Sequence, residues 1–186
     1  MNDFVSFDDY VTPEFHRLNL DIQHMIQSVP AHLQDILAPC PASNTTDGKL
    51  VLAHILPQSA TLVLNQPLAE LSTDAAARCQ VAVTNVLRIL ELLASNGANL
   101  VHMPPIFSYL VCNVGRSLIR KWKEMRKDAP AELLVTSEGT VGEPIHQAEA
   151  ALRKEIDLVF FALCRYGQRW PLGSKYLSPF CLGADD

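Results

Sequence analysis

The sequence lacks the features that tie a chain to a membrane, to a structural metal or to a well-known catalytic motif. Among its 186 residues there is no run of 18 consecutive apolar residues, so no membrane span is predicted. Its five cysteines are dispersed, and no two of them have the close spacing of a zinc site. The patterns GxGxxG, GxSxG and HExxH and the phosphate-binding P-loop are also missing. We therefore predict a metal-free chain without a motif-bearing active site.

Charge is also scarce. Only 19% of the residues are charged, whereas 48% are hydrophobic, which implies much buried surface or an apolar surface that another segment covers. The formal net charge is -5, so the chain as a whole has no electrostatic attraction to nucleic acid, and we expect no sequence-specific binding to DNA. The acidic segment 1–12 lacks the basic start and apolar core of a signal peptide. We expect an intracellular protein with reduced cysteines.

Apolar residues recur at spacings of three and four in five long segments, as in amphipathic helices. No alternating strand pattern and no internal repeat is present, so the sequence predicts an all-α fold, an irregular bundle of about five main helices without a sheet. Residues 13–186 are assigned to a single helical domain that follows a flexible acidic lead-in, residues 1–12. The predicted helices cover about 13–30, 49–65, 74–95, 105–127 and 144–166.

Two of these helices carry specific expectations. The first is predicted to begin at Thr12-Pro13, because proline favours the first helical position, and to turn one apolar face to the core. That face comprises Phe15, Leu18, Ile22, Met25, Ile26 and Val29. The second, 49–65, is apolar on most sides and is predicted to be central, with a kink or a break at Pro57.

A basic stripe is the strongest candidate for a contact surface. Arg116, Arg120, Lys123 and Lys127 fall on one side of a helix, opposite its apolar face. Such a stripe is in most cases simply the solvated face of an amphipathic helix. The alternative is a contact for an acidic partner or for nucleic acid. Trp122 falls on the apolar side, so the aromatic platform of a nucleic-acid site is missing.

His54 and Cys164 each allow a structural and a functional interpretation. His54 lies in an almost wholly apolar helix, where most histidines are hydrogen-bonded core or boundary residues, and it is also the best candidate for a polar group that lines a pocket. Cys164 lies in an apolar run, where burial raises the pKa of a thiol, so a core role is favoured over catalysis.

A metal-dependent enzyme of the isoprenoid type is the alternative from another functional class. Such enzymes hold several Mg²⁺ ions against a diphosphate with clustered carboxylates on facing helices. Asp8 and Asp9 form a carboxylate pair, but they belong to the acidic lead-in, and no second acidic cluster occurs within a predicted helix.

The C-terminal segment carries the most informative pattern. A predicted helix ends at Gly167, and Arg169-Trp170-Pro171 and then Tyr176-Leu177 follow it. This order resembles the end of the regulatory region of fungal zinc-cluster transcription factors, where a buried helix is followed by an RWP…YL segment. Other segments that are similar to motifs of that family occur, in the family's order, at 18–33, 50–68, 79–93 and 105–119.

The resemblance implies a nuclear regulatory domain that modulates transcription through an effector, a co-regulator or self-association as a homodimer, without itself binding DNA. The cysteine-rich zinc cluster that reads DNA in this family does not occur in the sequence. Zinc is therefore expected only in a separate DNA-binding domain, and no cofactor is expected in this chain. The candidate contacts for an effector or partner are His54, Arg116, Arg120, Lys123 and Trp170, and Trp170 is predicted to pack onto the helix before it and close the core.

Overall fold

The computed structural model describes residues 11–37, 46–128 and 143–169. These residues form an all-α fold without a β-sheet, so the predicted fold class is confirmed within the described ranges. The described elements are α2 (Pro13–Gln27), η1 (Ala31–Leu33), α3 (Gly48–Asn65), η2 (Gln66–Leu68), α4 (Thr73–Ser95), η3 (Leu100–His102), α5 (Ile106–Asp128) and α6 (Glu143–Gly167), where η denotes a short 3-10 helix.

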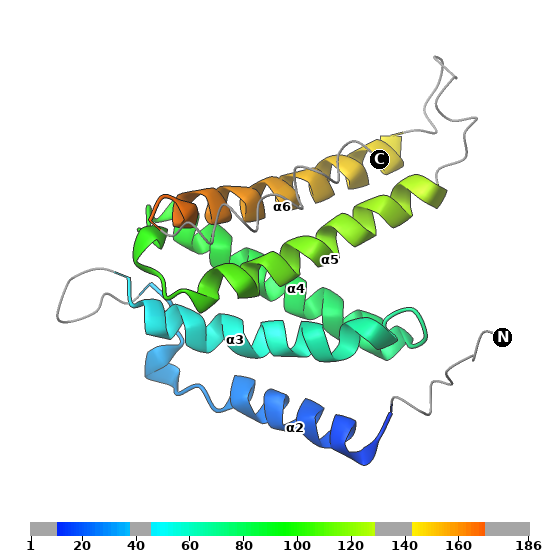
Figure 1. Ribbon diagram of the computed structural model, residues 1–186, viewed down its shortest axis with the longest axis horizontal. Coiled ribbons are helices and arrows are strands. Elements are labelled where there is room, and N and C mark those ends of the chain that lie inside the picture. Colours follow the sequence, from blue (N-terminus) through cyan, green and yellow to red (C-terminus); the bar gives the residue numbers. More distant parts are fainter. Residues whose placement is uncertain (1–10, 38–45, 129–142, 170–186) are drawn as a thin grey trace.

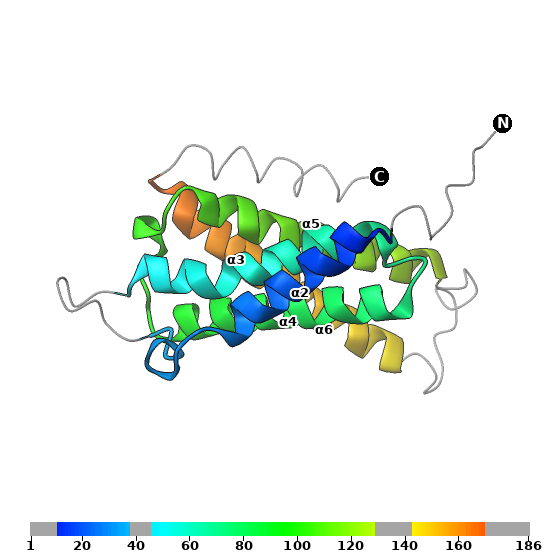
Figure 2. The same cartoon turned by 90° about the horizontal axis from the view of Figure 1, so that it is seen from below.

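The helices form a bundle with α3 near its centre, as predicted. Helix α3 packs against α2, α4 and α5, and α6 covers the opposite side of α4 and α5. Figure 1 shows α2 at one edge of the bundle and α6 at the other. Figure 2, turned by 90°, shows α2 lying obliquely across α3 and α4. None of the described helices is long and apolar enough to cross a membrane.

Local sequence signals set the helix ends. Thr12 caps α2, because its side-chain oxygen accepts a hydrogen bond from the Phe15 N–H at 3.2 Å, and Pro13 follows at the first helical position, as predicted. The hydroxyl oxygen of Ser72 caps α4 in the same way through the Ala75 N–H at 3.3 Å. Gly97 follows α4 with a φ of +64°, a left-handed conformation that favours glycine.

The core lies between α3, α4, α5 and α6. Helices α4 and α5 bury the apolar stripes that the sequence predicts for them, although Trp122 and Met125 at the end of α5 remain half-buried. Full burial of a large aliphatic or aromatic side chain stabilises a fold by about 1.5–3 kcal/mol. The largest fully buried side chains are Tyr166, Phe107, Ile55, Leu62, Leu90, Leu93, Met103, Leu163, Val51, Val86, Val111 and Val114.

Helix α2 departs from the prediction. Its one buried side chain is that of Asn19, whereas Leu18 and Met25, predicted to face the core, are 51% and 50% exposed. The helix contacts the bundle along its Asn19 edge, because the Asn19 amide bonds with Asn65 of α3. The apolar stripe therefore does not enter the core, and its predicted core role is wrong for Leu18, Met25 and also Ile26, which is 37% exposed.

Two predicted boundaries also differ. Helix α2 ends at Gln27, three residues before Pro30, where the sequence placed its end. Helix α3 runs through Pro57, so of the predicted kink or break the break is wrong, and the proline is buried within the bundle. Proline lacks the N–H that bonds within a helix, so packing of the surrounding helix offsets this loss.

Candidate interaction surfaces

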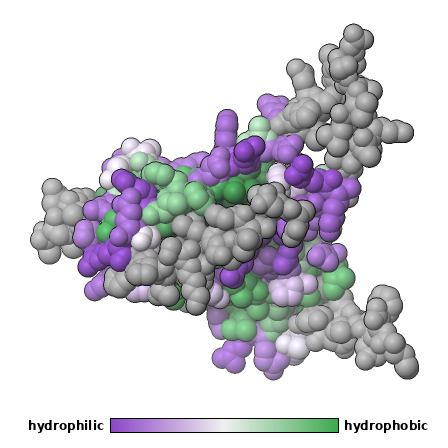
Figure 3. All heavy atoms as spheres, turned by 45° about the horizontal axis from the view of Figure 1, so that its top comes forward, coloured by the Kyte–Doolittle hydropathy of each residue, from purple (hydrophilic) through white to green (hydrophobic). Residues whose placement is uncertain are grey.

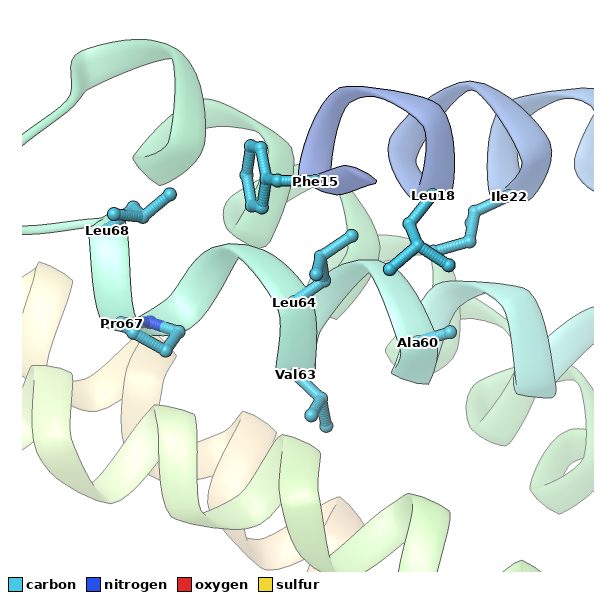
Figure 4. A pocket seen from close by; sticks show the side chains of 8 residues that line it. All are labelled: Phe15, Leu18, Ile22, Ala60, Val63, Leu64, Pro67 and Leu68. Atoms are coloured by element: carbon cyan, nitrogen blue, oxygen red, sulfur yellow. The ribbon is translucent and has the colours of Figure 1, made fainter. Parts of the chain in front are cut away.

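An apolar groove lies between α2 and the C-terminal half of α3. It encloses about 500 Å³, and none of its lining side chains has a charge or a hydrogen-bonding group. Figure 4 shows Leu18 and Ile22 of α2 directed toward α3, where Leu64 and Ala60 lie opposite. The apolar groove is present because the apolar face of α2 is not buried in the core. Its lining residues are Phe15, Leu18, Ile22, Ala60, Val63, Leu64, Pro67 and Leu68.

The two sides of the apolar groove differ in charge. On α2, Glu14, Leu18, Asp21 and Met25 follow one another at spacings of four, three and four, so they form one exposed row in which carboxylates alternate with apolar side chains. On the α3 side, residues 50–69 include no charged residue at all. Figure 3 shows apolar residues gathered into patches, one of them at the lower right, where α2 and the end of α3 lie.

Buried amide groups hold α2 in this orientation. The side-chain N–H of Asn65 donates to the Asn19 side-chain oxygen and to the Thr61 carbonyl oxygen, each at 2.9 Å. Asn65 is only 1% exposed, so these bonds are shielded from water. A second amide pair joins α3 to α4, where Asn85 of α4 donates to the side-chain oxygen of Gln58 at 3.3 Å. The Asn19–Asn65 bond therefore fixes which edge of α2 contacts α3.

Removing one member of the Asn19–Asn65 pair should be destabilising. Asn65→Leu leaves the buried Asn19 amide without its donor, and an unsatisfied buried polar group costs about 1–3 kcal/mol. Replacing both partners by apolar groups is nearly neutral in comparable cases. We therefore expect the double variant Asn19→Leu/Asn65→Leu to lose less stability than the two single variants together. Urea unfolding of all four proteins measures this; strictly additive losses would contradict a structural role for the pair.

The predicted basic stripe is confirmed as an exposed surface of α5. Arg116, Arg120, Lys123 and Lys127 are all exposed. We call these four residues the basic band. Residues 116–127 hold six of the fifteen arginines and lysines and only one acidic residue, Glu124, so their formal net charge is +5. The rest of the chain has nine basic and nineteen acidic residues, a formal net charge of -10.

Other cations of this segment have partners at the margin of the basic band. The Lys121 ammonium donates to the side-chain oxygen of Gln80 on α4 at 3.1 Å. The Arg126 guanidinium lies 4.8 Å from the centre of the half-buried Trp122 ring, a cation–π distance. The one ion pair that joins two described residues is elsewhere, between Arg78 and Asp74 at 2.6 Å on α4.

A smaller cavity flanks the basic band. We call it the α4–α5 cavity; it encloses about 280 Å³, and Cys79, Val83 and Leu118 contribute to its wall together with Arg120 and Lys121. The Cys79 thiol is buried and its sulfur lies 3.9 Å from the Leu62 carbonyl oxygen. Burial raises the pKa of this thiol, and the nearby Arg120 charge only partly offsets the effect, so the thiol is protonated at neutral pH and is a poor nucleophile.

His54 has a structural role. Its Nε2 atom lies 2.9 Å from the Leu33 carbonyl oxygen, so the half-buried ring ties η1 to α3. This contact agrees with one of the two interpretations of His54 from the sequence, that of a hydrogen-bonded boundary residue. His54 lines neither the apolar groove nor the α4–α5 cavity. Trp170, the other candidate outside the basic band, lies beyond the described residues.

The residues that bear on the predictions about metal and thiols lie only partly within the described ranges. Among the described residues, no three histidine, cysteine or acidic side chains are grouped closely enough to share a metal ion. Asp8 and Asp9, the carboxylate pair of the isoprenoid alternative, lie outside these ranges. Cys79 and Cys112 are free and buried, and Cys164 is half-buried. The expectation of free cysteines on helical apolar faces is thus confirmed for Cys79 and Cys112.

Comparison of the chain with protein-family models, with curated proteins and with solved structures finds no match. The fold and the surfaces above are therefore the basis for any functional assignment, together with the sequence resemblance.

Proposed function

We propose that this chain is a regulatory domain of a fungal zinc-cluster transcription factor and that it modulates transcription by binding an amphipathic helix of a co-regulator. The apolar groove between α2 and α3 is the observation that carries the proposal. The resemblance of the helical segments and of the Arg169-Trp170-Pro171 tail to that family supports the assignment to transcription. DNA contact is not part of the proposed role.

The chemistry of the apolar groove favours a helix as its occupant. Its two walls are themselves helices, and Leu18 and Met25 on α2 face the same side as Ile22, at the spacing that interdigitates with a third helix. A solvent-exposed apolar surface of this kind marks an interaction site in many soluble proteins. The proposed partner is therefore an amphipathic helix whose apolar stripe packs against Leu18, Ile22 and Val63.

The charges along α2 indicate which charge the residues beside the partner's apolar stripe should carry. Glu14 and Asp21 are exposed along the α2 edge, whereas the α3 wall is uncharged. A helix with lysine or arginine beside its apolar stripe would pair with these carboxylates, and an acidic helix would be repelled. We therefore assign a basic amphipathic helix to the apolar groove.

Helix α2 supplies a matched pair of variants to test this role. Leu18 and Leu20 are 51% and 55% exposed, but only Leu18 lines the apolar groove. When the chain is fused to an unrelated DNA-binding domain in a fungal reporter strain, we expect it to change reporter transcription at least threefold. Leu18→Glu should abolish that change, because it places a carboxylate in the apolar contact, and Leu20→Glu should leave it intact.

Stability serves as the control in this experiment. Both substitutions are at exposed positions, where changes usually stay within about 0.5 kcal/mol, so both variants should melt like the parent chain. Equal reporter output from Leu18→Glu and the parent would contradict the role of the apolar groove. No effect of the parent chain on any reporter would contradict the assignment to transcription itself.

A further inference from the structure

The basic band is a regular row of cations on a solvent-facing helix. Arg116, Arg120, Lys123 and Lys127 are separated by four, three and four residues, so they span about 16 Å at a rise of 1.5 Å per residue. Like charges at these spacings repel one another and destabilise a helix. No ion pair between described residues neutralises any of the four. Glu124, four residues after Arg120, offsets part of this charge, and the remaining formal net charge of +5 over residues 116–127 favours an anionic partner.

The adjoining α4–α5 cavity adds an apolar site to this row. Arg120 belongs both to the basic band and to the cavity, so the two features are continuous. Val83 and Leu118 give the cavity apolar walls, and its volume of about 280 Å³ is just below the range of small-molecule sites, so one bulky side chain fills it. Glu70 and Glu124 also line it and offset Arg120 and Lys121, so the cavity itself is close to neutral.

We propose that the basic band and the α4–α5 cavity together bind an acidic peptide segment that carries one large apolar side chain. The carboxylates of the segment pair with Arg116, Arg120 and Lys123, and the apolar side chain enters the cavity between α4 and α5. Charge complementarity selects the partner. This surface shares no lining residue with the apolar groove between α2 and α3, and the proposal does not depend on the function assigned to that groove.

The extent of the basic band distinguishes a peptide from a nucleic acid. The band is one helix wide, and the remainder of the chain has a formal net charge of -10. A duplex that continues past the band gains no further net positive charge from the rest of the chain, whereas about five residues of an extended peptide already span the band. The Trp122 ring is half-buried and lies against the Arg126 guanidinium, so it is not a free platform for base stacking.

The test uses the full chain and three fluorescent probes at physiological salt. The first is a 12-residue peptide of glutamate and aspartate with one central phenylalanine, the second has serine in place of that phenylalanine, and the third is a 16-base-pair DNA duplex. We expect fluorescence anisotropy to show binding of the first peptide, at least tenfold weaker binding of the second, and weaker binding of the duplex than of the first peptide.

Two triple variants locate the site. Arg116→Glu/Arg120→Glu/Lys123→Glu should weaken binding of the phenylalanine peptide at least tenfold. A matched control, with the same change in net charge at exposed positions outside the basic band, is Arg17→Glu/Lys49→Glu/Arg88→Glu, and its affinity should stay within threefold of the parent. Thermal melts of both variants must match the parent, so that altered binding reports the surface rather than unfolding.

Several results would overturn the proposal. They are no binding of the phenylalanine peptide, equal affinity of the two peptides, tighter binding of the duplex than of the peptide, and equal losses in the two triple variants. Tighter binding of the duplex would indicate that the basic band binds nucleic acid. Equal losses in the two triple variants would indicate that net charge alone determines the affinity.

Discussion

Replacing Phe107 with alanine is expected to destabilise the chain by about 3–5 kcal/mol, the usual range for a fully buried phenylalanine. The Phe107 side chain is 0% exposed in the first turn of α5, and its ring centre lies 5.9 Å from that of Tyr166 at the end of α6, which is also fully buried. The substitution removes this contact and leaves a cavity between the two helices. Total stability of a domain is roughly 5–15 kcal/mol, so a large share would be lost.

A phenylalanine on α6 provides the control. Phe161 is 46% exposed, and its only ring partner among the described residues is the Arg165 guanidinium at 5.9 Å, a contact worth about 0.5–1 kcal/mol at an exposed site. Phe161→Ala should therefore cost about 1 kcal/mol or less. Urea unfolding followed by circular dichroism measures both variants. Equal losses for Phe107→Ala and Phe161→Ala would show that the core does not close where α5 meets α6.

The contrast between α5 and α2 shows what the sequence alone can predict. The apolar positions of α5 lie on one stripe, and the basic band lies on the opposite side. Its orientation follows from helix geometry once the apolar side is buried. The exposed positions of Arg116, Arg120 and Lys123 were therefore predictable without a structure. Helix starts were predictable for a similar local reason, since Thr12 and Ser72 cap the N–H groups three residues ahead of them.

The orientation of α2 could not be predicted in this way. Its apolar stripe is regular, yet the helix packs through Asn19, whose partner Asn65 is 46 residues away in the chain. Periodicity records which residues share a face and contains no information on which buried amide will find a partner. The apolar groove follows from this pairing, so the sequence identified Leu18 and Ile22 as core residues and missed the surface that they line. The α4–α5 cavity likewise needs the packing of two helices.

The C-terminal tail carries a prediction that concerns residues outside the described ranges. Trp170 and Pro171 follow the end of α6, and we predict that the Trp170 ring packs back onto the 157–164 portion of this helix. That portion offers an apolar surface. Phe160 and Phe161 are 39% and 46% exposed there, although Val159 and Leu163 beside them are fully buried. A tryptophan ring placed against Phe160 would remove apolar area of both rings from water.

Trp170→Ala should then cost on the order of 3–5 kcal/mol, as for other buried tryptophans. For a chain of this length each 1 kcal/mol shifts the melting temperature by roughly 2–4 °C, so the loss corresponds to a decrease of roughly 6–20 °C. Trp170→Phe, which keeps an aromatic ring, should retain most of the parent's melting temperature. A thermal melt by circular dichroism compares the three proteins. An unchanged melting temperature for Trp170→Ala would refute the core role, and it would make the exposed tryptophan part of an interface with another chain or domain.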